Sequence, residues 1–438
     1  MIQFIYNLSI LIFFPILFLR FLYKNKTLNN SFDEFKIRFL GIPIRENIFL
    51  ENVNPKNLVW IHAVSLGETY AAIPMIHELE KKSPHVRFLL TSTTKSGYDA
   101  VESLLKSGKL DKKKICHQLC PYDFYWSMKY FVQSYSPSIL ILIETEIWPN
   151  LICCFYRENK KIILASARLS LKSLSRYKRT GWIFRFFLNK VSLVLAQSEL
   201  DRHNFKKVGL LGNIEVVGNL KFDLPVDQNL KDIGVSLRKY LDKRSVFLAL
   251  STRKGEEKEI LAAWKKVYVP TSLLILVPRH PERSKSVLLI AQGLNLSCIL
   301  RSELDLRGNK VKRGKLDRAV LIGDSLRESQ IYIAASDIVL MGGSLKKLGG
   351  QNPIEACAQS KPVFFGPHMF NFRVIASELV KKGGGFEIKS YEDWFDLGNK
   401  LFKKQCELDK AVHACYSVYR SGTGPSKKCA DHISKFLK

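Results

Sequence analysis

The sequence predicts an α/β protein of two doubly wound domains, in which parallel strands alternate with helices. Short apolar strands recur along the chain with amphipathic helices between them, in two successive runs. A polar stretch containing a proline, at 224–243, separates the runs. The strand at 139–143 is apolar on both faces, which is typical of a parallel sheet covered by helices on both sides.

Each run contributes one predicted sheet. The predicted strands are at 58–62, 86–90, 139–143, 162–165, 193–196 and 214–217 in the first run, and at 246–250, 273–277, 319–322, 338–341 and 363–365 in the second. The predicted divisions are an anchor at 1–23, a first domain at 30–223, a linker at 224–243, a second domain at 244–405 and a basic helical segment at 406–438.

The first 23 residues are almost all apolar, and about 20 residues of helix cover the hydrocarbon core of a bilayer. A cleaved signal peptide would carry basic residues before the apolar run and small residues at a cleavage site, and neither is present. Basic residues such as Arg20 and Lys24 follow the apolar part instead, which places the bulk of the chain in the cytoplasm. We therefore expect an uncleaved N-terminal anchor that either spans the membrane or lies deep in its interface.

The formal net charge of +28 implies an anionic partner, which can be nucleic acid, an acidic membrane surface or a phosphorylated substrate. Binding to nucleic acid would need basic residues interleaved with stacking aromatics, or a recognisable module, and the sequence has neither. The nine cysteines have no metal-binding spacing and no disulfide-like density, so we interpret them as core residues in a reducing compartment.

Polar signatures follow the predicted strands, where parallel sheets bind their ligands. They are Ser65–Glu68, Glu144–Glu146, Lys221, Ser251–Arg253, Pro278–Pro281, Gly323–Asp324 and the loop that begins at Gly342. This distribution predicts a binding cleft between the two domains.

The stretch at 337–367 has the order strand, glycine loop, helix, strand. Asn352 is the predicted N-cap of its helix, with Pro353 at the first helical position and Glu355 at the third. Such a layout binds phosphate, because loop amides and the helix dipole both point at an anion. An ordinary βαβ crossover, whose glycines only make tight turns, fits the same pattern.

Six motifs in one order carry a resemblance that spans most of the chain. They are HAVSLGE at 62–68, ETEIWPN at 144–150, GNLKFD at 218–223, PRHPER at 278–283, GGS at 342–344 with NPIE at 352–355, and GPHMFNF at 366–372. Together they closely resemble the 3-deoxy-D-manno-octulosonic acid (Kdo) transferases of bacterial lipopolysaccharide synthesis. The resemblance implies a GT-B glycosyltransferase with two Rossmann-like domains facing a cleft.

The resemblance also implies the reaction. An inverting, cofactor-free enzyme would move Kdo from CMP-Kdo to the lipid A precursor at the cytoplasmic face of the inner membrane. The first domain would hold the acceptor and the second the CMP-sugar. The anionic membrane surface would be a further partner. The alternatives are a sugar-nucleotide epimerase or hydrolase, or another lipopolysaccharide glycosyltransferase, on the same fold.

In the first domain, the resemblance makes Glu68 the general base that removes the proton of the attacking hydroxyl. Ser65–Glu68 is also a capping box by pattern, so a purely structural role stays open. Glu146 and Lys221 match family positions near the reacting centre, where a lysine can offset the charge of the leaving phosphate. The alternatives are a solvated loop lysine at 221, and a helix cap for Glu144 and Glu146. The role of Glu144 is left open.

In the second domain, the resemblance gives a set of CMP-binding residues: Pro278, Arg279, Glu328, Gly343, Ser344, Asn352, Pro353, Ile354 and Glu355. Arginine suits a phosphate because its fork donates two parallel hydrogen bonds. The sequence departs from the family pattern at Arg253 and Gln351, where His is usual, and at Leu326-Arg327, where Met-Gly precedes the Glu. We expect these departures to alter details at the nucleotide and to leave the activity intact.

No metal is expected. His62, His280 and His368 lie on different predicted loops, and the sequence has no Asp-x-Asp motif to hold a divalent ion on a nucleotide. We therefore predict metal-independent chemistry.

Overall fold

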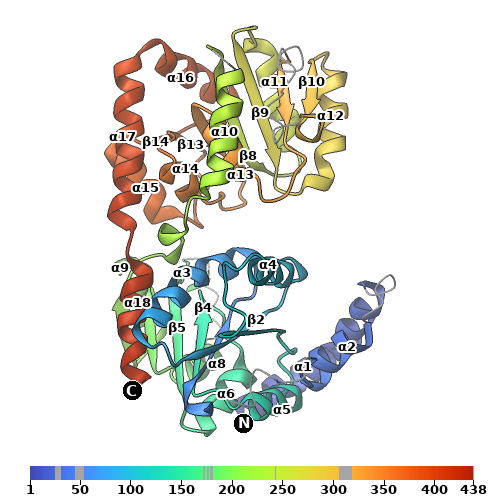
Figure 1. The fold of residues 1–438 in the computed structure, drawn as a ribbon, viewed down its shortest axis with the longest axis vertical. Helices are drawn as coiled ribbons and strands as arrows, with labels where there is room; N and C mark the ends of the chain where they lie inside the picture. Colours follow the sequence, from blue (N-terminus) through green and yellow to red (C-terminus); the bar gives the residue numbers. More distant parts are fainter. Residues whose placement is uncertain are drawn as a thin grey trace. The chain divides into compact units, whose positions relative to one another are not determined.

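The structure is a computed structural model that describes residues 1–24, 31–44, 54–170, 173–174, 177, 181–241, 243–304 and 318–437. The chain forms two compact units, one of Met1–Leu224 with Gly424–Lys438 and the other of Pro225–Thr423 (Figure 1). Each unit holds one parallel seven-stranded sheet covered by helices, which confirms the predicted fold class of two doubly wound α/β domains.

The strands of unit 1 have the order β3-β2-β1-β4-β5-β6-β7, and all of them run parallel. Their bounds are β1 Leu58–His62, β2 Arg87–Ser92, β3 Ile115–Leu119, β4 Ile139–Ile143, β5 Lys161–Ala167, β6 Leu193–Ala196 and β7 Asn213–Val216. The order reverses between β1 and β4, as in a Rossmann fold, so the loops after these two strands diverge and leave room for a ligand.

The helices of unit 1 cover both faces of this sheet. They are α1 Ile2–Lys24, α2 Ser31–Phe35, α3 Leu66–Lys82, α4 Lys95–Lys106, α5 Tyr125–Tyr135, α6 Pro149–Arg157, α8 Gly181–Leu188, α9 Glu199–Val208 and α18 Pro425–Ile433, with a 3₁₀ turn η3 at Leu220–Asp223. Alternate residues of β1 enter opposite cores: Val59 packs with residues of α3 and α18, and Trp60 with residues of α5 and α6.

The strands of unit 2 have the order β10-β11-β9-β8-β12-β13-β14, again all parallel. They are β8 Ser245–Thr252, β9 Ser272–Pro278, β10 Cys298–Leu300, β11 Val320–Ile322, β12 Ile338–Met341, β13 Val363–Phe365 and β14 Gly385–Glu387. The helices are α10 Gln228–Tyr240, α11 Glu256–Val267, α12 Ser284–Gly293, α13 Ser329–Ala335, α14 Ile354–Ala358, α15 Arg373–Lys382, α16 Tyr391–Lys403 and α17 Gln405–Gly422, with a 3₁₀ turn η4 at Pro281–Arg283.

The sequence analysis missed three strands, β3, β10 and β14, and all three lie at the edges of their sheets. Polar residues interrupt β3, which contains His117 and Gln118, and the other two strands are only three residues long. Edge strands need fewer apolar residues because one side has no neighbour, so their pattern is weak.

Two segments differ from the predicted divisions. The predicted linker at 224–243 contains helix α10, which packs on α13 through Gly234 and the buried Leu237. The predicted C-terminal segment at 406–438 is divided, because α17 belongs to unit 2 and α18 returns to unit 1. Asp223 fixes this return by accepting hydrogen bonds from the backbone N–H groups of Gly424 and Ser426, both at 2.6 Å.

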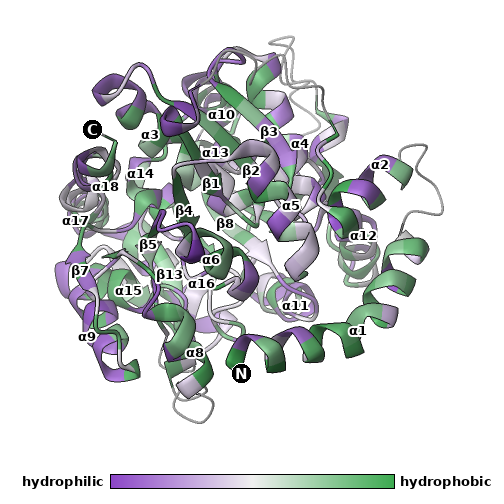
Figure 2. Cartoon of the chain, turned by 90° about the horizontal axis from the view of Figure 1, so that it is seen from below, coloured by the Kyte–Doolittle hydropathy of each residue, from purple (hydrophilic) through white to green (hydrophobic). Residues whose placement is uncertain are grey.

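Helix α1 packs against the rest of unit 1 and exposes a mostly apolar outer face (Figure 2). Among the described residues, Ile2–Tyr23 is the one stretch of helix that is long and apolar enough to cross a membrane. Its inner face is bound to the domain by specific contacts: Tyr6 donates to Asp123 at 2.8 Å, and the ring of Phe14 packs on Phe39 and Phe124.

Gly234 provides a test of the contact between α10 and α13. A Cβ at this position would lie 2.4 Å from the carbonyl oxygen of Ile331, so Gly234→Ala should lower the free energy of unfolding by about 1–3 kcal/mol through overpacking. Gly293→Ala, at the end of α12 with no atom near the added Cβ, is the matched control and should be neutral or stabilising. Urea unfolding followed by circular dichroism measures both, and an unchanged midpoint for Gly234→Ala would contradict the close packing.

Candidate functional site

Glu68 lies in the first turn of α3, directly after the carboxyl end of β1. Its carboxylate accepts a hydrogen bond from the hydroxyl of Ser65 and another from the backbone N–H of Val64, both at 2.8 Å. The Ser65 side chain in turn accepts from the N–H of Glu68 at 3.4 Å. The predicted capping box is therefore present in a modified form, in which the glutamate reaches back to the amide of Val64.

The environment of Glu68 changes its acidity. Burial raises its pKa to about 7, and the negative charges of Glu144 and Glu146 act in the same direction. The hydrogen bonds from Ser65 and Val64 oppose the shift only in part. A carboxyl group that titrates near neutral pH can take up a proton in a reaction, which an ordinary helix cap does not require.

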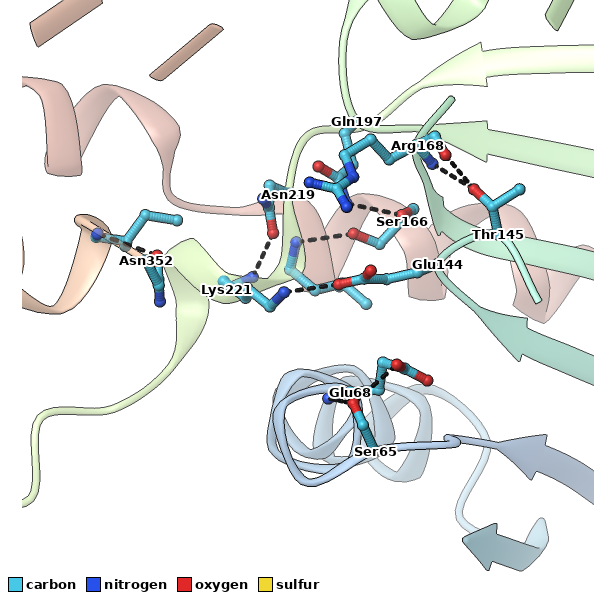
Figure 3. Close-up of polar contacts among 12 residues, drawn as sticks. Ser65, Glu68, Glu144, Thr145, Ser166, Arg168, Gln197, Asn219, Lys221 and Asn352 are labelled. Atoms are coloured by element: carbon cyan, nitrogen blue, oxygen red, sulfur yellow. Dashed lines mark hydrogen bonds and ion pairs between the residues drawn. The ribbon is translucent and has the colours of Figure 1, made fainter. Parts of the chain in front are cut away.

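Glu144 and Lys221 form an ion pair at the same edge of the sheet (Figure 3). Glu144 follows β4 with a left-handed backbone (φ 60°), and its Oε1 accepts from the Nζ of Lys221 at 2.6 Å. Burial alone would raise the pKa of Glu144, but the charges of Lys221 and Arg168 outweigh it and lower the pKa. Glu144 is therefore held as a carboxylate beside a lysine that comes from turn η3, 77 residues later.

Glu146 has a different partner. The indole Nε1 of Trp148 donates to its Oε2 at 2.9 Å, while burial raises its pKa and the charge of Glu144 adds to the effect. The alternative that Glu144 or Glu146 caps α6 is wrong, because Asp123 accepts from the first free amides of that helix, at Asn150 and Leu151.

Unit 1 thus gathers Glu68, Glu144, Glu146 and Lys221 after β1, β4 and β7. The sequence analysis had left Glu144 open and had missed Arg168, whose charge acts on Glu144. Arg168 directly follows the carboxyl end of β5, and the other polar signatures also follow strands. Its position after a predicted strand could therefore have identified it as a candidate site residue. The pairing of Lys221 with Glu144 was not predictable from local sequence, because it joins two distant loops.

In unit 2, the predicted nucleotide residues follow β9, β11 and β12. Pro278 is buried at the end of β9, and Arg279 is exposed beyond it, with its backbone N–H bound to the carbonyl oxygen of Thr252 at 2.9 Å. Glu328 forms an ion pair with Arg301, whose Nη2 donates to Oε1 at 3.0 Å. The guanidinium of Arg279 is thus presented to solvent, and the carboxylate of Glu328 is engaged within the protein.

The glycine loop after β12 is bonded to the rest of unit 2. The N–H of Gly343 donates to the carboxylate of Glu256 at 2.7 Å, and the buried hydroxyl of Ser344 donates to the carbonyl of Met341 while accepting from the N–H of Gly366. These groups are bonded within the protein. The loop is therefore held in place by Glu256 and by the Ser344 hydroxyl, and its Gly343 amide already has a partner within the protein.

Helix α14 begins at Ile354, one residue later than predicted, and is only five residues long. Asn352 still caps this turn, because its side-chain oxygen accepts from the N–H of Ile354 at 3.1 Å, while Pro353 is buried. Glu355 accepts from the hydroxyl of Ser329 at 3.0 Å. Asn352 and Glu355 remain partly exposed beside this turn.

Among the described residues, no three or more His, Cys, Asp or Glu side chains are grouped so as to hold a metal ion. The three histidines considered above have other surroundings. His62 is buried against Thr91 and Trp148, and His280 lies 3.4 Å from the guanidinium of Arg253. His368 is half-buried, and its backbone N–H donates to the carbonyl oxygen of Ser344 at 3.0 Å.

Comparisons with known proteins agree with one another. A family model described as 3-deoxy-D-manno-octulosonic-acid transferase (kdotransferase) matches residues 40–224. A 3-deoxy-D-manno-octulosonic acid transferase of Haemophilus influenzae is 30% identical over 389 residues, which are 88% of this chain and 88% of that protein. The protein of the same name from Bordetella pertussis is 31% identical over 384 residues, 86% of this chain and 87% of its own.

A solved structure shares the two-domain fold. A glycosyltransferase from Rickettsia africae superposes with a TM-score of 0.57, covering 87% of this chain and 98% of its own at 14% identity. At that identity the likeness concerns the fold, and the relatives above carry the similarity in sequence.

The raised pKa of Glu68 predicts a pH-dependent stability. The folded state holds the proton more tightly than the unfolded state, so the free energy of unfolding should fall as pH rises from about 4.5 to about 7, by about 3 kcal/mol at most. Glu68→Gln keeps the shape of the cap and should remove this loss, making the variant more stable than wild type at pH 8. Glu78→Gln on the same helix is the control, and denaturant unfolding at pH 5 and pH 8 makes the comparison. Equal pH dependence in Glu68→Gln and wild type would contradict the raised pKa.

Proposed function

Because the chain belongs to the 3-deoxy-D-manno-octulosonic acid transferase family and is a glycosyltransferase, we propose that it transfers Kdo from CMP-Kdo to a lipid A precursor. The observation that carries this proposal is the similarity to two transferases of that name over at least 86% of each chain. A sugar-nucleotide epimerase can share the two-sheet fold, but it would not account for that similarity in sequence.

Glu68 is the general base of the proposed reaction. As the acceptor hydroxyl attacks the anomeric carbon, the hydroxyl proton passes to the Glu68 carboxylate and the bond from that carbon to the CMP phosphate breaks. A base works best when its pKa is near the working pH, and the pKa of about 7 meets that condition. A single displacement of this kind inverts the anomeric centre.

Lys221 offsets the negative charge that grows on the phosphate as CMP leaves. Its ion pair with Glu144 fixes the position of the ammonium group, so Glu144 joins Glu146 and Lys221 in the proposed reacting centre. Glu146, which accepts a hydrogen bond from Trp148, is the third carboxylate of the proposed reacting centre, after Glu68 and Glu144.

Unit 2 would bind the CMP part of the donor. The exposed guanidinium of Arg279, beside Pro278, is suited to the phosphate, and Asn352 and Glu355 with their neighbours Pro353 and Ile354 are suited to the ribose. Gly343, Ser344 and Glu328 would shape this site, since their polar groups are bonded within the protein. The proposed reaction needs no metal and no cofactor.

We place the protein at the cytoplasmic face of the inner membrane, where the lipid acceptor would be found. The inner face of α1 is tied to unit 1 by Tyr6 and by the packing of Phe14, while Ile12, Ile16 and Leu19 are exposed. A helix held along the domain in this way favours an interfacial anchor over an isolated span. The net charge of +28 would add attraction to anionic lipid headgroups.

The transfer assay tests the function directly. Purified protein with CMP-Kdo, a tetraacylated lipid A precursor and EDTA should give products heavier by one or more Kdo residues, counted by mass spectrometry. Glu68→Gln should lower kcat at least about 100-fold, because proton removal by a positioned base contributes that much or more. In wild type, kcat/KM should fall as pH drops below about 7. Absence of transfer by folded wild type, with or without added metal, would overturn the proposal.

Flotation with vesicles of anionic phospholipid tests the membrane surface. Replacing Ile12, Ile16 and Leu19 by Asp should reduce the vesicle-bound fraction at least tenfold, because each change removes an apolar side chain from the outer face of α1. Leu211→Asp, which changes a still more exposed leucine before β7, is the control and should float like wild type. Undiminished flotation of the triple variant would exclude α1 as the anchor.

A further inference from the structure

Two consecutive glutamates at the start of α11, Glu256 and Glu257, are almost completely buried. Glu256 is 2% exposed and Glu257 is 1% exposed. Burying carboxylates costs free energy unless each oxygen is well bonded, and placing two side by side adds repulsion. Such a pair is a poor way to stabilise a fold, and the groups that its oxygens bind indicate another role.

Glu256 joins the loops that follow two adjacent strands, β8 and β12. Its Oε2 accepts from the backbone N–H of Arg253 at 2.8 Å and from that of Gly343 at 2.7 Å. Its Oε1 accepts from the hydroxyl of Tyr391, at the start of α16, at 3.0 Å. One carboxylate oxygen therefore bridges the turn after β8 and the glycine loop after β12.

Glu257 holds the loop after β9, the other neighbour of β8. Its carboxylate accepts from the guanidinium of Arg283 in a two-pronged ion pair, at 2.6 Å and 3.0 Å, and from the hydroxyl of Thr252 at 3.1 Å. Arg283 ends turn η4, four residues after Arg279. The two glutamates together bind the loops after β9, β8 and β12, which are consecutive in the sheet.

The backbone is strained where β8 meets its loop. Ser251, one residue before the end of β8, has a left-handed conformation (φ 58°), which is costly for a residue with a side chain. The glycine loop after β12 touches this end of β8, since a Cβ on Gly342 would lie 2.3 Å from the carbonyl oxygen of Ser251. A local backbone preference would not maintain this arrangement without contacts from outside the loops.

We propose that Glu256 and Glu257 are positioning residues, which hold the three loops in the geometry that binds the nucleotide of the donor. The inference rests on the proposed function, because Arg279, Gly343 and Ser344 lie on these loops and Pro278 ends β9. Neither glutamate would touch the donor. Both act through the backbone of the loops and through Arg283.

The side-chain chemistry distinguishes the two positions. In Glu256→Gln, the amide oxygen can accept both backbone N–H groups while the amide nitrogen donates to the hydroxyl of Tyr391, so the bridge survives. In Glu257→Gln, the amide nitrogen meets the guanidinium of Arg283, and two donors face each other. The same substitution should therefore be tolerated at 256 and harmful at 257.

The experiment measures CMP binding by calorimetry and KM for CMP-Kdo and for the lipid acceptor, on the full chain. Glu256→Ala and Glu257→Gln should each weaken CMP binding at least tenfold and raise KM for CMP-Kdo, with KM for the acceptor within twofold of wild type. Glu256→Gln should restore CMP affinity to within threefold. Glu259→Ala is the control, because it removes an exposed glutamate of the same helix whose surface ion pair with Lys346 contributes little.

Hydrogen–deuterium exchange provides a readout that does not depend on the donor. The amides of Arg253 and Gly343 should exchange faster in Glu256→Ala than in wild type or Glu259→Ala. If Glu256→Ala does not fold, the isosteric pair Glu256→Gln and Glu257→Gln makes the same comparison through CMP affinity, together with exchange in the loop after β9.

The outcomes separate the two proposals. CMP affinity within twofold of wild type in folded Glu256→Ala and in Glu257→Gln would overturn the positioning role, and so would equal weakening by Glu256→Gln and Glu256→Ala. Wild type that binds no CMP would overturn the proposed function. In that case, unchanged exchange at residues 253 and 343 in Glu256→Ala would overturn the positioning role as well.

Discussion

Buried carboxylates that accept hydrogen bonds from loop amides are the interaction on which both units depend. In a parallel sheet, helices begin near the carboxyl ends of the strands, and the first N–H groups of each helix have no partner within it. Carboxylates accept amides at two such helix starts, Asp123 from Asn150 and Leu151 and Asp223 from Gly424 and Ser426. Other carboxylates accept amides of the loops after the strands: Glu68 accepts from Val64, Asp201 from Leu169, and Glu256 from Arg253 and Gly343. The loops are thus ordered by acidic residues at the edge where an anionic substrate would bind.

The acidity of each carboxylate depends on what accompanies these hydrogen bonds. Glu68 has burial and two neighbouring carboxylates, and its pKa rises to about 7. Glu144 is also buried, but Lys221 and Arg168 lower its pKa. One edge of the sheet therefore holds an acid that titrates near neutral pH beside one that stays ionised. Such a separation of pKa values is the usual basis for assigning a base and an electrostatic partner among neighbouring acids.

The sequence predicted those features that arise from local pattern. Apolar runs located the central strands, and the capping pattern located Glu68, because each signal lies within a few residues. Features that depend on distant partners were not predictable: Lys221 meets Glu144 across 77 residues, and the Gly343 amide is bound by Glu256 from 87 residues away. Helix α10 was taken for a linker because the stretch at 224–243 is polar and contains a proline. Its packing on α13 depends on the close approach of Gly234 to Ile331, a residue distant in the sequence.

The departures from the family pattern can be understood from the backbone. Arg327 stands where a glycine usually precedes the glutamate, and its φ of 64° is in the left-handed region that glycine adopts without cost. An arginine in this conformation costs about 1 kcal/mol or somewhat more. Arg253 replaces a histidine, but Glu256 binds its backbone N–H, which is the same for either residue. Main-chain hydrogen bonds to a buried carboxylate therefore fix the backbone at residue 253 whichever side chain it carries.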